Sequence, residues 1–334
     1  MSELISIVMP VKNAAPYLKD CLESIQAQSY PNWELLAVDD HSIDESAELL
    51  KSYSQDDPRI HYRENSGEGI IHALRTAYGF TKGNYIHRMD ADDLMAPKKL
   101  KLLYQLIQKF GRSTITTGLV QYFAEGGVSD GYLKYEKWLN DLSKSNSHWE
   151  EVYQECVIAS PCWLIHRDDL DAVGAFDHDR YPEDYDLVFR FYEKGMKVKS
   201  VKEVLHYWRD HAERSSRNHA HYQANSFFAL KLHFFLKLER DPKRSLVIWG
   251  AGPKGKRLAK MLNRQGIDFE WVSNNPNKHG KEIYEQIMRS FKKILEFNRP
   301  QVIVTVAQRK AKQEIVDFLE SNGLEVKEDY WFFR

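Results

Sequence analysis

The fold is decided by one stretch of the chain, Asn84-Tyr85-Ile86-His87-Arg88-Met89-Asp90-Ala91-Asp92-Asp93. A strand-like run ends at Met89, and three carboxylates follow within four residues. Carboxylates so close together are costly to keep ionised and partly desolvated unless a cation lies beside them. Oxygen ligands suit a hard ion such as Mg²⁺ or Mn²⁺, which usually keeps water and takes substrate phosphates as its other ligands. The stretch therefore predicts a metal that handles a diphosphate, and the competing interpretation is a solvated acidic loop that caps a helix beginning near Pro97.

The composition limits the class of protein. A chain of 334 residues suggests two domains, and 43% hydrophobic with 28% charged residues is typical of a soluble globular protein. A formal net charge of −1 gives no reason to expect a nucleic-acid partner. We expect neither a transmembrane helix nor a signal peptide, and the three cysteines lack metal-ligand spacing and fit a reducing compartment. The expected location is the cytoplasm, including the inner face of its membrane.

Upstream of the acidic stretch, strand-like and helix-like segments alternate. We expect strands at 4–9, 33–38, 59–62 and 84–89, and helices at 16–28, 44–53 and 67–80. This alternation, with continuously apolar strands, predicts a parallel sheet with helices on both faces. Ligands bind at the carboxyl ends of such strands, where the polar clusters 10–13, 39–42 and 90–93 lie.

The pattern downstream is less regular. We expect helices at 98–110 and 183–194, and strands at 114–123, 157–167 and 198–208. Residues 126–148 read mostly as loop and short helix, with aromatic residues that could line an acceptor site. A long helical pattern over 218–240 is expected to pack between two domains, and its phenylalanine stripe is also compatible with peripheral contact to a membrane surface.

From Lys243 the strand–helix alternation begins again. Gly250, Gly252 and Gly255 follow a strand at 245–249 with the spacing Gly-x-Gly-x-x-Gly, which offers backbone N–H groups to a phosphate. Ser273-Asn274-Asn275 stands where an acidic residue usually meets a ribose, and this argues against NAD. Another nucleotide, a sugar phosphate or no ligand stay open. The segment resembles small Rossmann modules appended to sugar-modifying enzymes.

Four N-terminal segments, taken in order, resemble family 2 nucleotide-sugar glycosyltransferases of the GT-A fold. The segments are 5–13, 18–28, 33–44 and 83–97, and the resemblance extends over residues 4–215. It implies an α/β protein in which a GT-A-type doubly wound mixed sheet is followed by a second, small Rossmann-like α/β domain. We place the glycosyltransferase domain at 1–217, a helical linker at 218–243 and the Rossmann-like domain at 244–334.

The resemblance implies a nucleotide site at the ends of the first two strands. Pro10, Val11 and Asn13 lie where the family packs against the base and ribose. Asp40, with Asp39, lies where a carboxylate accepts the imide N–H of the base, which favours uracil, thymine or guanine over adenine. The alternative role of the two aspartates is turn formation and helix capping.

The resemblance also implies a role for each residue in and near the acidic stretch. Asp92 would bind the metal directly, Asp90 would contact the ribose or a metal-bound water, and Asp93 would orient these groups. His211, after the last strand, would reach the metal or the diphosphate. Arg88 would either pair with the diphosphate or hold Asp90 or Asp92.

Glu183 and Asp184 match the family's Glu-Asp catalytic motif at the start of a helix. An inverting transfer needs a base opposite the leaving diphosphate, and a helix N-terminus keeps a carboxylate ionised. Asp184 is therefore the expected base and Glu183 its support, with helix capping as the alternative. Arg75 is a further candidate for a phosphate contact.

Together these interpretations predict an inverting, Mg²⁺- or Mn²⁺-dependent glycosyltransferase. It would move a single sugar from a nucleoside-diphosphate sugar, with UDP favoured, to a hydroxyl of a glycan or lipid-linked acceptor. One alternative is a sugar-phosphate nucleotidyltransferase, although 10–13 lacks the glycines its basic loop would need. The other is a non-catalytic nucleotide-sugar-binding or scaffold protein. The sequence leaves the oligomeric state open.

Overall fold

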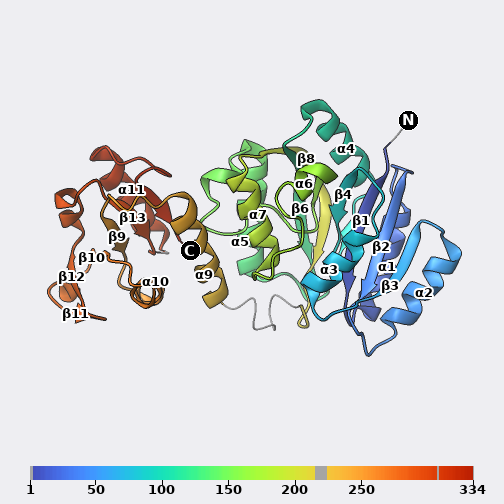
Figure 1. The fold of residues 1–334 in the computed structure, drawn as a ribbon, viewed down its shortest axis with the longest axis horizontal. Coiled ribbons are helices and arrows are strands. Elements are labelled where there is room, and N and C mark those ends of the chain that lie inside the picture. Colours follow the sequence, from blue (N-terminus) through green and yellow to red (C-terminus); the bar gives the residue numbers. More distant parts are fainter. Residues whose placement is uncertain (1–2, 215–223, 307, 334) are drawn as a thin grey trace. The chain divides into compact units, whose positions relative to one another are not determined.

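The computed structural model describes residues 3–214, 224–306 and 308–333, which form two compact units (Figure 1). The first unit comprises Met1–Trp149 and Val157–Asn218, and the second comprises Glu150–Cys156 and His219–Arg334. Helix α9 (Ala224–Leu238) belongs to the second unit in this division, rather than forming a separate linker.

The first unit is built on a mixed sheet whose described strands run in the order β3-β2-β1-β4-β7-β6-β8-β5. The strands are β1 (Ile5–Val11), β2 (Trp33–Asp39), β3 (Ile60–Glu64), β4 (Tyr85–Arg88), β5 (Leu94–Met95), β6 (Thr114–Phe123), β7 (Trp163–His166) and β8 (Lys197–Arg209). Strands β1 to β4 are parallel, as expected, whereas β7 runs antiparallel to both β4 and β6. This is the predicted doubly wound mixed α/β sheet.

The longer helices of the first unit carry apolar residues that are buried in its core. The helices of this unit are α1 (Ala15–Gln26), α2 (Ser46–Asp56), α3 (Ile70–Gly79), α4 (Lys99–Phe110), α5 (Asp130–Ser145), the 3₁₀ turn η1 (His148–Glu150), α6 (Arg167–Asp171) and α7 (Glu183–Glu193). In α1 the apolar stripe is Leu18, Cys21, Leu22 and Ile25, at the i, i+3, i+4, i+7 spacing of one helix face. These residues join one core with alternate residues of β1.

Two segments of the first unit differ from the sequence-based expectation. Residues 126–148, predicted to be mostly loop and short helix, contain the 16-residue helix α5. Its Tyr132, Tyr135 and Trp138, at helical spacing, are partly buried against the core. Within 157–167 only Trp163–His166 is strand, because the preceding residues turn into it through a bond from Cys162 N to Ala159 O.

The second unit contains a smaller sheet, with its described strands in the order β11-β12-β10-β9-β13-β14. Its strands are β9 (Leu246–Trp249), β10 (Glu270–Ser273), β11 (Glu282–Ile283), β12 (Gln286–Ser290), β13 (Gln301–Val304) and β14 (Tyr330–Phe332). Its remaining helices are α10 (Pro253–Arg264), η3 (Pro276–Lys278), η4 (Phe291–Glu296) and α11 (Arg309–Ser321). Strand β9 pairs in parallel with β10 and β13, which is the expected Rossmann-like arrangement; β12 and β14 were not expected.

The phenylalanine stripe of α9 is largely used inside the second unit. Phe228, Phe234 and Phe235 are buried, and the rings of Phe228 and Phe235 contact Phe333. These rings are therefore not available to rest on a membrane. Residues 218–223 of the expected helix lie outside the described part of the chain. None of the helices in the described ranges has both the length and the apolar character needed to cross a bilayer.

Candidate active site

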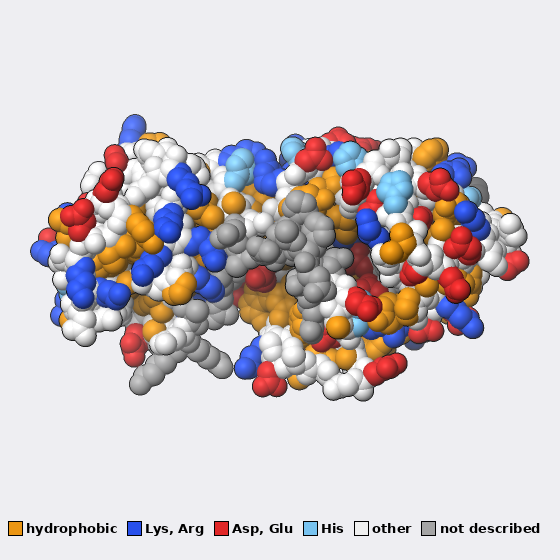
Figure 2. Space-filling model, turned by 90° about the horizontal axis from the view of Figure 1, so that it is seen from below, with side chains coloured by type: hydrophobic (Ala, Val, Ile, Leu, Met, Phe, Trp, Pro, Cys, Tyr) orange, Lys and Arg blue, Asp and Glu red, His pale blue; other side chains and the backbone are white. Residues whose placement is uncertain are grey.

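The carboxyl ends of β1, β2 and β4 bring the predicted polar clusters to one edge of the sheet. The register places Val11 opposite Asp39 and Val8 opposite Arg88. The backbone N–H of Asp40 then donates to Val11 O at 2.7 Å. Figure 2 looks onto this edge of the first unit and shows Asp and Glu side chains gathered in a hollow.

The loops after β1 and β2 are fastened to each other. Asn13 and His41 both have positive φ, at 49° and 58°, a conformation that Asn and His adopt more readily than most residues. Asn13 Oδ1 accepts from Ile43 N, and Asn13 N donates to Ser42 Oγ, each at 2.9 Å. The Asn13 side chain therefore shapes the loop, while Pro10 remains partly exposed beside it.

The two aspartates at the end of β2, Asp39 and Asp40, differ in how many of their oxygen atoms already have hydrogen-bond partners. Asp40 Oδ1 accepts from Asn65 Nδ2 at 2.6 Å and Gly69 N at 2.9 Å, and its Oδ2 pairs with Lys12 Nζ at 3.1 Å. Asp39 Oδ2 accepts from Ser42 N at 3.2 Å, whereas Asp39 Oδ1 is buried without a partner among the described residues. A buried unpaired carboxylate oxygen is unfavourable unless a ligand donates to it. Of the pair, Asp39 is thus better placed to receive a donor from a ligand.

Arg88 links the two acidic parts of the edge. Its Nε donates to Asp90 Oδ1 and its Nη1 to Glu183 Oε1, each at 3.1 Å, and only 5% of its side chain is exposed. Burial raises the pKa of Asp90, the Arg88 charge opposes this rise, and the Asp92 charge adds to it. Of the two roles considered for Arg88, the observed contacts match the one in which it holds Asp90.

Asp92 and His211 form the pair in which a metal was expected. Asp92 Oδ2 lies 2.9 Å from His211 Nε2, and both side chains are partly exposed, at 26% and 14%. The His211 ring lies 4.4 Å from the Tyr17 ring, and Arg209 Nε donates to the backbone oxygen of Asp92 at 2.8 Å. No described group of three His, Cys, Asp or Glu side chains is close enough to enclose an ion. One carboxylate and one imidazole fit Mg²⁺ or Mn²⁺ provided that phosphate and water complete the shell.

Asp93 lies beneath this pair in a buried polar chain that the sequence reading missed in part. Arg209 N donates to Asp93 Oδ1 at 2.8 Å, and His206 Nε2 lies 3.0 Å from Asp93 Oδ2. Lys99 Nζ, fully buried, donates to His206 Nδ1 at 3.0 Å and to Pro161 O at 2.6 Å. Burial, followed by the charge of Lys99, lowers the pKa of His206. Lys99 was the sequence signal for this buried polar chain, because it is a charged residue within the apolar stripe of α4.

Helix α7 presents the predicted catalytic pair. Glu183 is held by Arg88, whereas Asp184 is partly exposed and its Oδ1 accepts from the backbone of Tyr185 at 2.7 Å. Burial, followed by the charge of Glu183, raises the pKa of Asp184 to about 7. A carboxyl with this pKa can exchange a proton near neutral pH, as a general base requires.

Arg75 does not face this pair. Its Nε donates to Phe176 O at 2.7 Å, and its Nη2 donates to Asp177 O and to Asp179 Oδ1, each at 2.6 Å. Arg75, which was a candidate for a phosphate contact, therefore ties α3 to the segment that precedes α7.

A cavity of about 410 Å³ opens beside His211 in the first unit. Tyr17 and Arg209 line it together with the turn after β6, and its remaining lining residues are Phe123, Ala124, Glu125, Gly126, Gly127, Asp210 and Ala212. A ligand held by the Asp92–His211 pair can extend into this space.

The glycine-rich loop of the second unit packs closely against the sheet. Gly250 has a φ of +137°, and a Cβ on Gly255 would lie 2.0 Å from Gly250 O. Trp249 Nε1 donates to Asn274 Oδ1, and Trp271 Nε1 donates to Gly250 O at 2.8 Å. The two acceptor oxygens, Asn274 Oδ1 and Gly250 O, are therefore hydrogen-bonded to tryptophan side chains, and these bonds compete with any bond to a nucleotide. Gly252 is exposed, and a Cβ there would meet open space.

Comparison with known proteins defines the class. The model of the family described as Glycosyl transferase family 2 matches residues 6–174, half of the chain. The chain belongs to this family and is a glycosyltransferase. It is 27% identical over 218 residues to the glycosyltransferase GlyG of Streptococcus pneumoniae, covering 63% of this chain and 71% of GlyG. Two other relatives are longer proteins, of which the match spans only 22% and 31%.

Solved structures agree on the fold. Residues 1–349 of S. aureus TarS, in complex with UDP-GlcNAc, have a TM-score of 0.54 at 15% identity, covering 79% of this chain and 72% of that one. The mannosyltransferase PcManGT of Pyrobaculum calidifontis, in complex with GDP-Man and Mn²⁺, has a TM-score of 0.50 at 17% identity, covering 78% and 68%. The predicted GT-A-type sheet is thereby confirmed.

Proposed function

We propose that this glycosyltransferase moves a single sugar from a nucleoside-diphosphate sugar to a hydroxyl of a glycan or lipid-linked acceptor, with inversion and with help from a divalent cation. The observation that carries the proposal is the joint placement of Asp184 and the acidic edge. Arg88 bonds both Glu183, next to Asp184, and Asp90, so a base and a diphosphate site are held in one network. Inverting transfer requires these two elements at opposite sides of the sugar.

The donor's base is assigned to the loop pair after β1 and β2. Asp39 Oδ1 is buried and lacks a partner among the described groups, so it can accept an imide N–H. Uracil and guanine both carry this donor, and UDP-GlcNAc and GDP-Man are the ligands of the two neighbours. We favour a UDP-sugar and place the contact on Asp39, while Asp40 organises the loop through Asn65, Gly69 and Lys12. Pro10 and Val11 would border the nucleoside.

The diphosphate is assigned to the Asp92–His211 pair. Asp92 and His211, with Asp90 next to them, would hold Mg²⁺ or Mn²⁺, whose charge would stabilise the departing nucleoside diphosphate. The Mn²⁺ in the PcManGT complex is consistent with such an ion. Arg209, which bonds the Asp92 backbone, fixes the position of this carboxylate.

The acceptor is activated by Asp184. In its ionised form this carboxylate takes the proton of the acceptor hydroxyl while the oxygen attacks the anomeric carbon. Its pKa of about 7 leaves a large ionised fraction at neutral pH and makes it a stronger base than an ordinary aspartate. Arg88 donates to Glu183 and holds it in place beside Asp184.

A donor panel tests the proposal. UDP-, GDP-, dTDP- and ADP-sugars are incubated with the enzyme and Mn²⁺ or Mg²⁺, and release of the nucleoside diphosphate is measured with and without simple glycan acceptors. We expect release from one donor class, stimulated by the correct acceptor. Failure of calorimetry with saturating Mn²⁺ to detect binding of any nucleoside diphosphate would overturn the assignment.

A further inference from the structure

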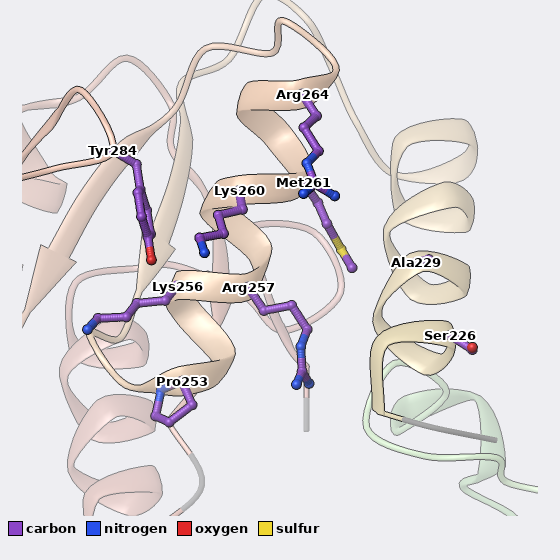
Figure 3. Close-up of a pocket in the computed structure, with 9 residues that line it drawn as sticks. All are labelled: Ser226, Ala229, Pro253, Lys256, Arg257, Lys260, Met261, Arg264 and Tyr284. Carbon is purple, nitrogen blue, oxygen red and sulfur yellow. The ribbon is translucent and has the colours of Figure 1, made fainter. Parts of the chain in front are cut away.

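The second unit contains a groove that the transfer reaction does not use. It has a volume of about 630 Å³, and α10 supplies most of its lining, with Tyr284 on one side and α9 on the other (Figure 3). We call it the basic groove, and its lining residues are Ser226, Ala229, Pro253, Lys256, Arg257, Lys260, Met261, Arg264 and Tyr284. Figure 2 shows Lys and Arg side chains gathered on the face of the second unit that bears α10.

The charge of the basic groove is one-sided. Lys256, Arg257, Lys260 and Arg264 line it, and no carboxylate does. Within the described part of the chain, none of these four cations forms an ion pair. Lys256, Lys260 and Arg264 are each one helical turn apart, so their charges repel one another along α10. An anion bound between them would relieve this repulsion.

Two of the cations make cation–π contacts with aromatic rings. Arg257 lies with its guanidinium carbon 5.5 Å from the centre of the Phe228 ring, and Lys260 Nζ lies 4.9 Å from that of Tyr284. Tyr284 itself stacks on Trp271 with 6.3 Å between ring centres and 15° between planes. In Figure 3 Lys256 and Lys260 extend to the side of α10 where Tyr284 lies, whereas Arg257, Met261 and Arg264 extend to the side of α9. Side chains placed in this way lose less freedom when they bind.

The shape of the site favours a small ligand. The groove is recessed between two walls, and Lys256 and Arg257 are half-buried in it. A membrane surface would instead require cations on a protruding face. Successive turns of α10 separate its basic side chains by about 6 Å along the helix, which lets neighbouring cations contact different phosphoryl groups. Tyr284, partly exposed, offers a flat surface to a sugar ring or base.

We propose that the basic groove binds a soluble carbohydrate or nucleotide derivative that carries at least two phosphoryl groups. Lys256, Lys260, Arg264 and Arg257 hold the phosphoryl oxygens, and Tyr284 packs against the attached ring. The site lies along α10, with none of Gly250, Gly252 and Gly255 in its lining, and it needs neither Asp92 nor a metal. It gives the second unit a ligand-binding role of its own.

Calorimetry in the presence of a metal chelator tests this site without a contribution from the metal-dependent donor site. The probes are inorganic tripolyphosphate and glucose 1,6-bisphosphate, compared with inorganic phosphate, on the full-length chain. We expect both probes to bind more tightly than phosphate. The double variant Lys256→Gln/Lys260→Gln should weaken both by about tenfold or more, because it removes two charge-assisted contacts. Lys260→Arg should retain binding.

The matched control is Lys281→Gln/Lys292→Gln, which removes the same charge from exposed positions outside the groove. The proposal is overturned if wild type binds neither probe or if the control weakens binding as much as the groove variant. If the protein binds neither probe but sediments with vesicles of phosphatidylcholine and phosphatidylglycerol in equal parts, the basic groove faces a membrane and the proposal is also overturned. Since the chelator removes the cation assigned to the donor site, none of these results bears on sugar transfer.

Discussion

At the scale of single residues, the site separates groups that organise from groups that remain free to react. Carboxylate oxygens of three residues accept hydrogen bonds from neighbouring protein groups, namely those of Asp40, Asp93 and Glu183. Asp39 keeps a buried oxygen without a partner among the described residues, and Asp184 is partly exposed with a raised pKa. The acidic residues of the motifs therefore divide into a scaffold and a reacting set, and the two sets respond differently to substitution.

The first prediction contrasts two isosteric substitutions. Asp184→Asn should lower the turnover rate by about 10²–10⁴-fold, because it removes the base, and should leave metal-dependent binding of nucleoside diphosphate intact. Asp92→Asn should abolish transfer and also weaken that binding. Transfer assays and calorimetry with Mn²⁺ measure the two effects, and a variant with wild-type activity would contradict the corresponding role.

The second prediction concerns pH. The base acts in its ionised form, and the pKa of Asp184 is raised to about 7 by burial and by Glu183. Below pH 7 the carboxyl is protonated, so kcat/KM should fall about tenfold for each pH unit, and above pH 7 it should level off. The profile is measured at constant metal and donor. A flat profile between pH 5 and 8, or loss of activity as the pH rises through 7, would exclude Asp184 as the base.

At the scale of elements, buried contacts between strands and helices hold the site in shape. Lys99 of α4 hydrogen-bonds the side chain of His206 in β8. His206 in turn hydrogen-bonds the side chain of Asp93, which follows β4. In the second unit, the start of α10 lies directly against the end of β9. Each contact fixes where a helix can lie relative to its sheet.

The third prediction tests the buried chain through Lys99. Lys99→Met fills similar space but leaves His206 Nδ1 and Pro161 O without a donor at a fully buried position. We expect a loss of about 1–3 kcal/mol in the free energy of unfolding and a raised KM for the donor. Urea unfolding measures the first effect. The control is Lys101→Met, an exposed lysine on the same helix, which should change neither quantity. Equal stability of the two variants would refute the account.

The fourth prediction compares two glycines of one loop. A Cβ on Gly255 would lie 2.0 Å from a backbone oxygen, whereas a Cβ on Gly252 would meet nothing within 4 Å. Gly255→Ala should therefore destabilise the second unit by about 1–3 kcal/mol through overpacking. Gly252→Ala should stay within about 0.5 kcal/mol of wild type. Thermal unfolding distinguishes them, and matching midpoints would show that the loop is not tightly packed.

At the scale of the whole molecule, two units with separate cores carry separate tasks. One core joins β1 and β2 to α1 and α4, and another joins β9 and β13 to α11. The family match, residues 6–174, lies in the first unit apart from the segment Glu150–Cys156. The basic groove lies in the second.

The fifth prediction follows from this division. A nucleoside diphosphate with Mn²⁺ should raise the unfolding temperature of the first unit alone, because only ligands that bind the folded unit stabilise it. Scanning calorimetry should show one shifted and one unshifted transition, and Gly255→Ala should lower the unshifted one. A chelator should cancel the shift. A single transition that moves as a whole would mean that the units unfold together.

Local sequence patterns were sufficient to predict much of the secondary structure of this protein. The parallel strands, the helix stripe of α1 and the glycine loop followed from the sequence because periodicity and turn residues act over a few positions. The motifs also located Asp92, His211 and the Glu183–Asp184 pair at strand and helix ends. Helix α5 was missed because its aromatic residues, at helical spacing, were assigned to a ligand site instead of the core.

Other features depended on contacts between residues far apart in the chain. Tertiary structure alone decided that Arg88 joins Asp90 to Glu183, that Arg75 is occupied by the 176–179 segment, and that Lys99 supports His206. It also decided that Asp39, rather than Asp40, has a buried oxygen with no partner within the part of the chain that the structure describes. Hydrogen-bond partners and burial determine which member of an acidic pair is available and where its pKa lies, and neither can be read from residue order, because both arise only when separate elements pack together.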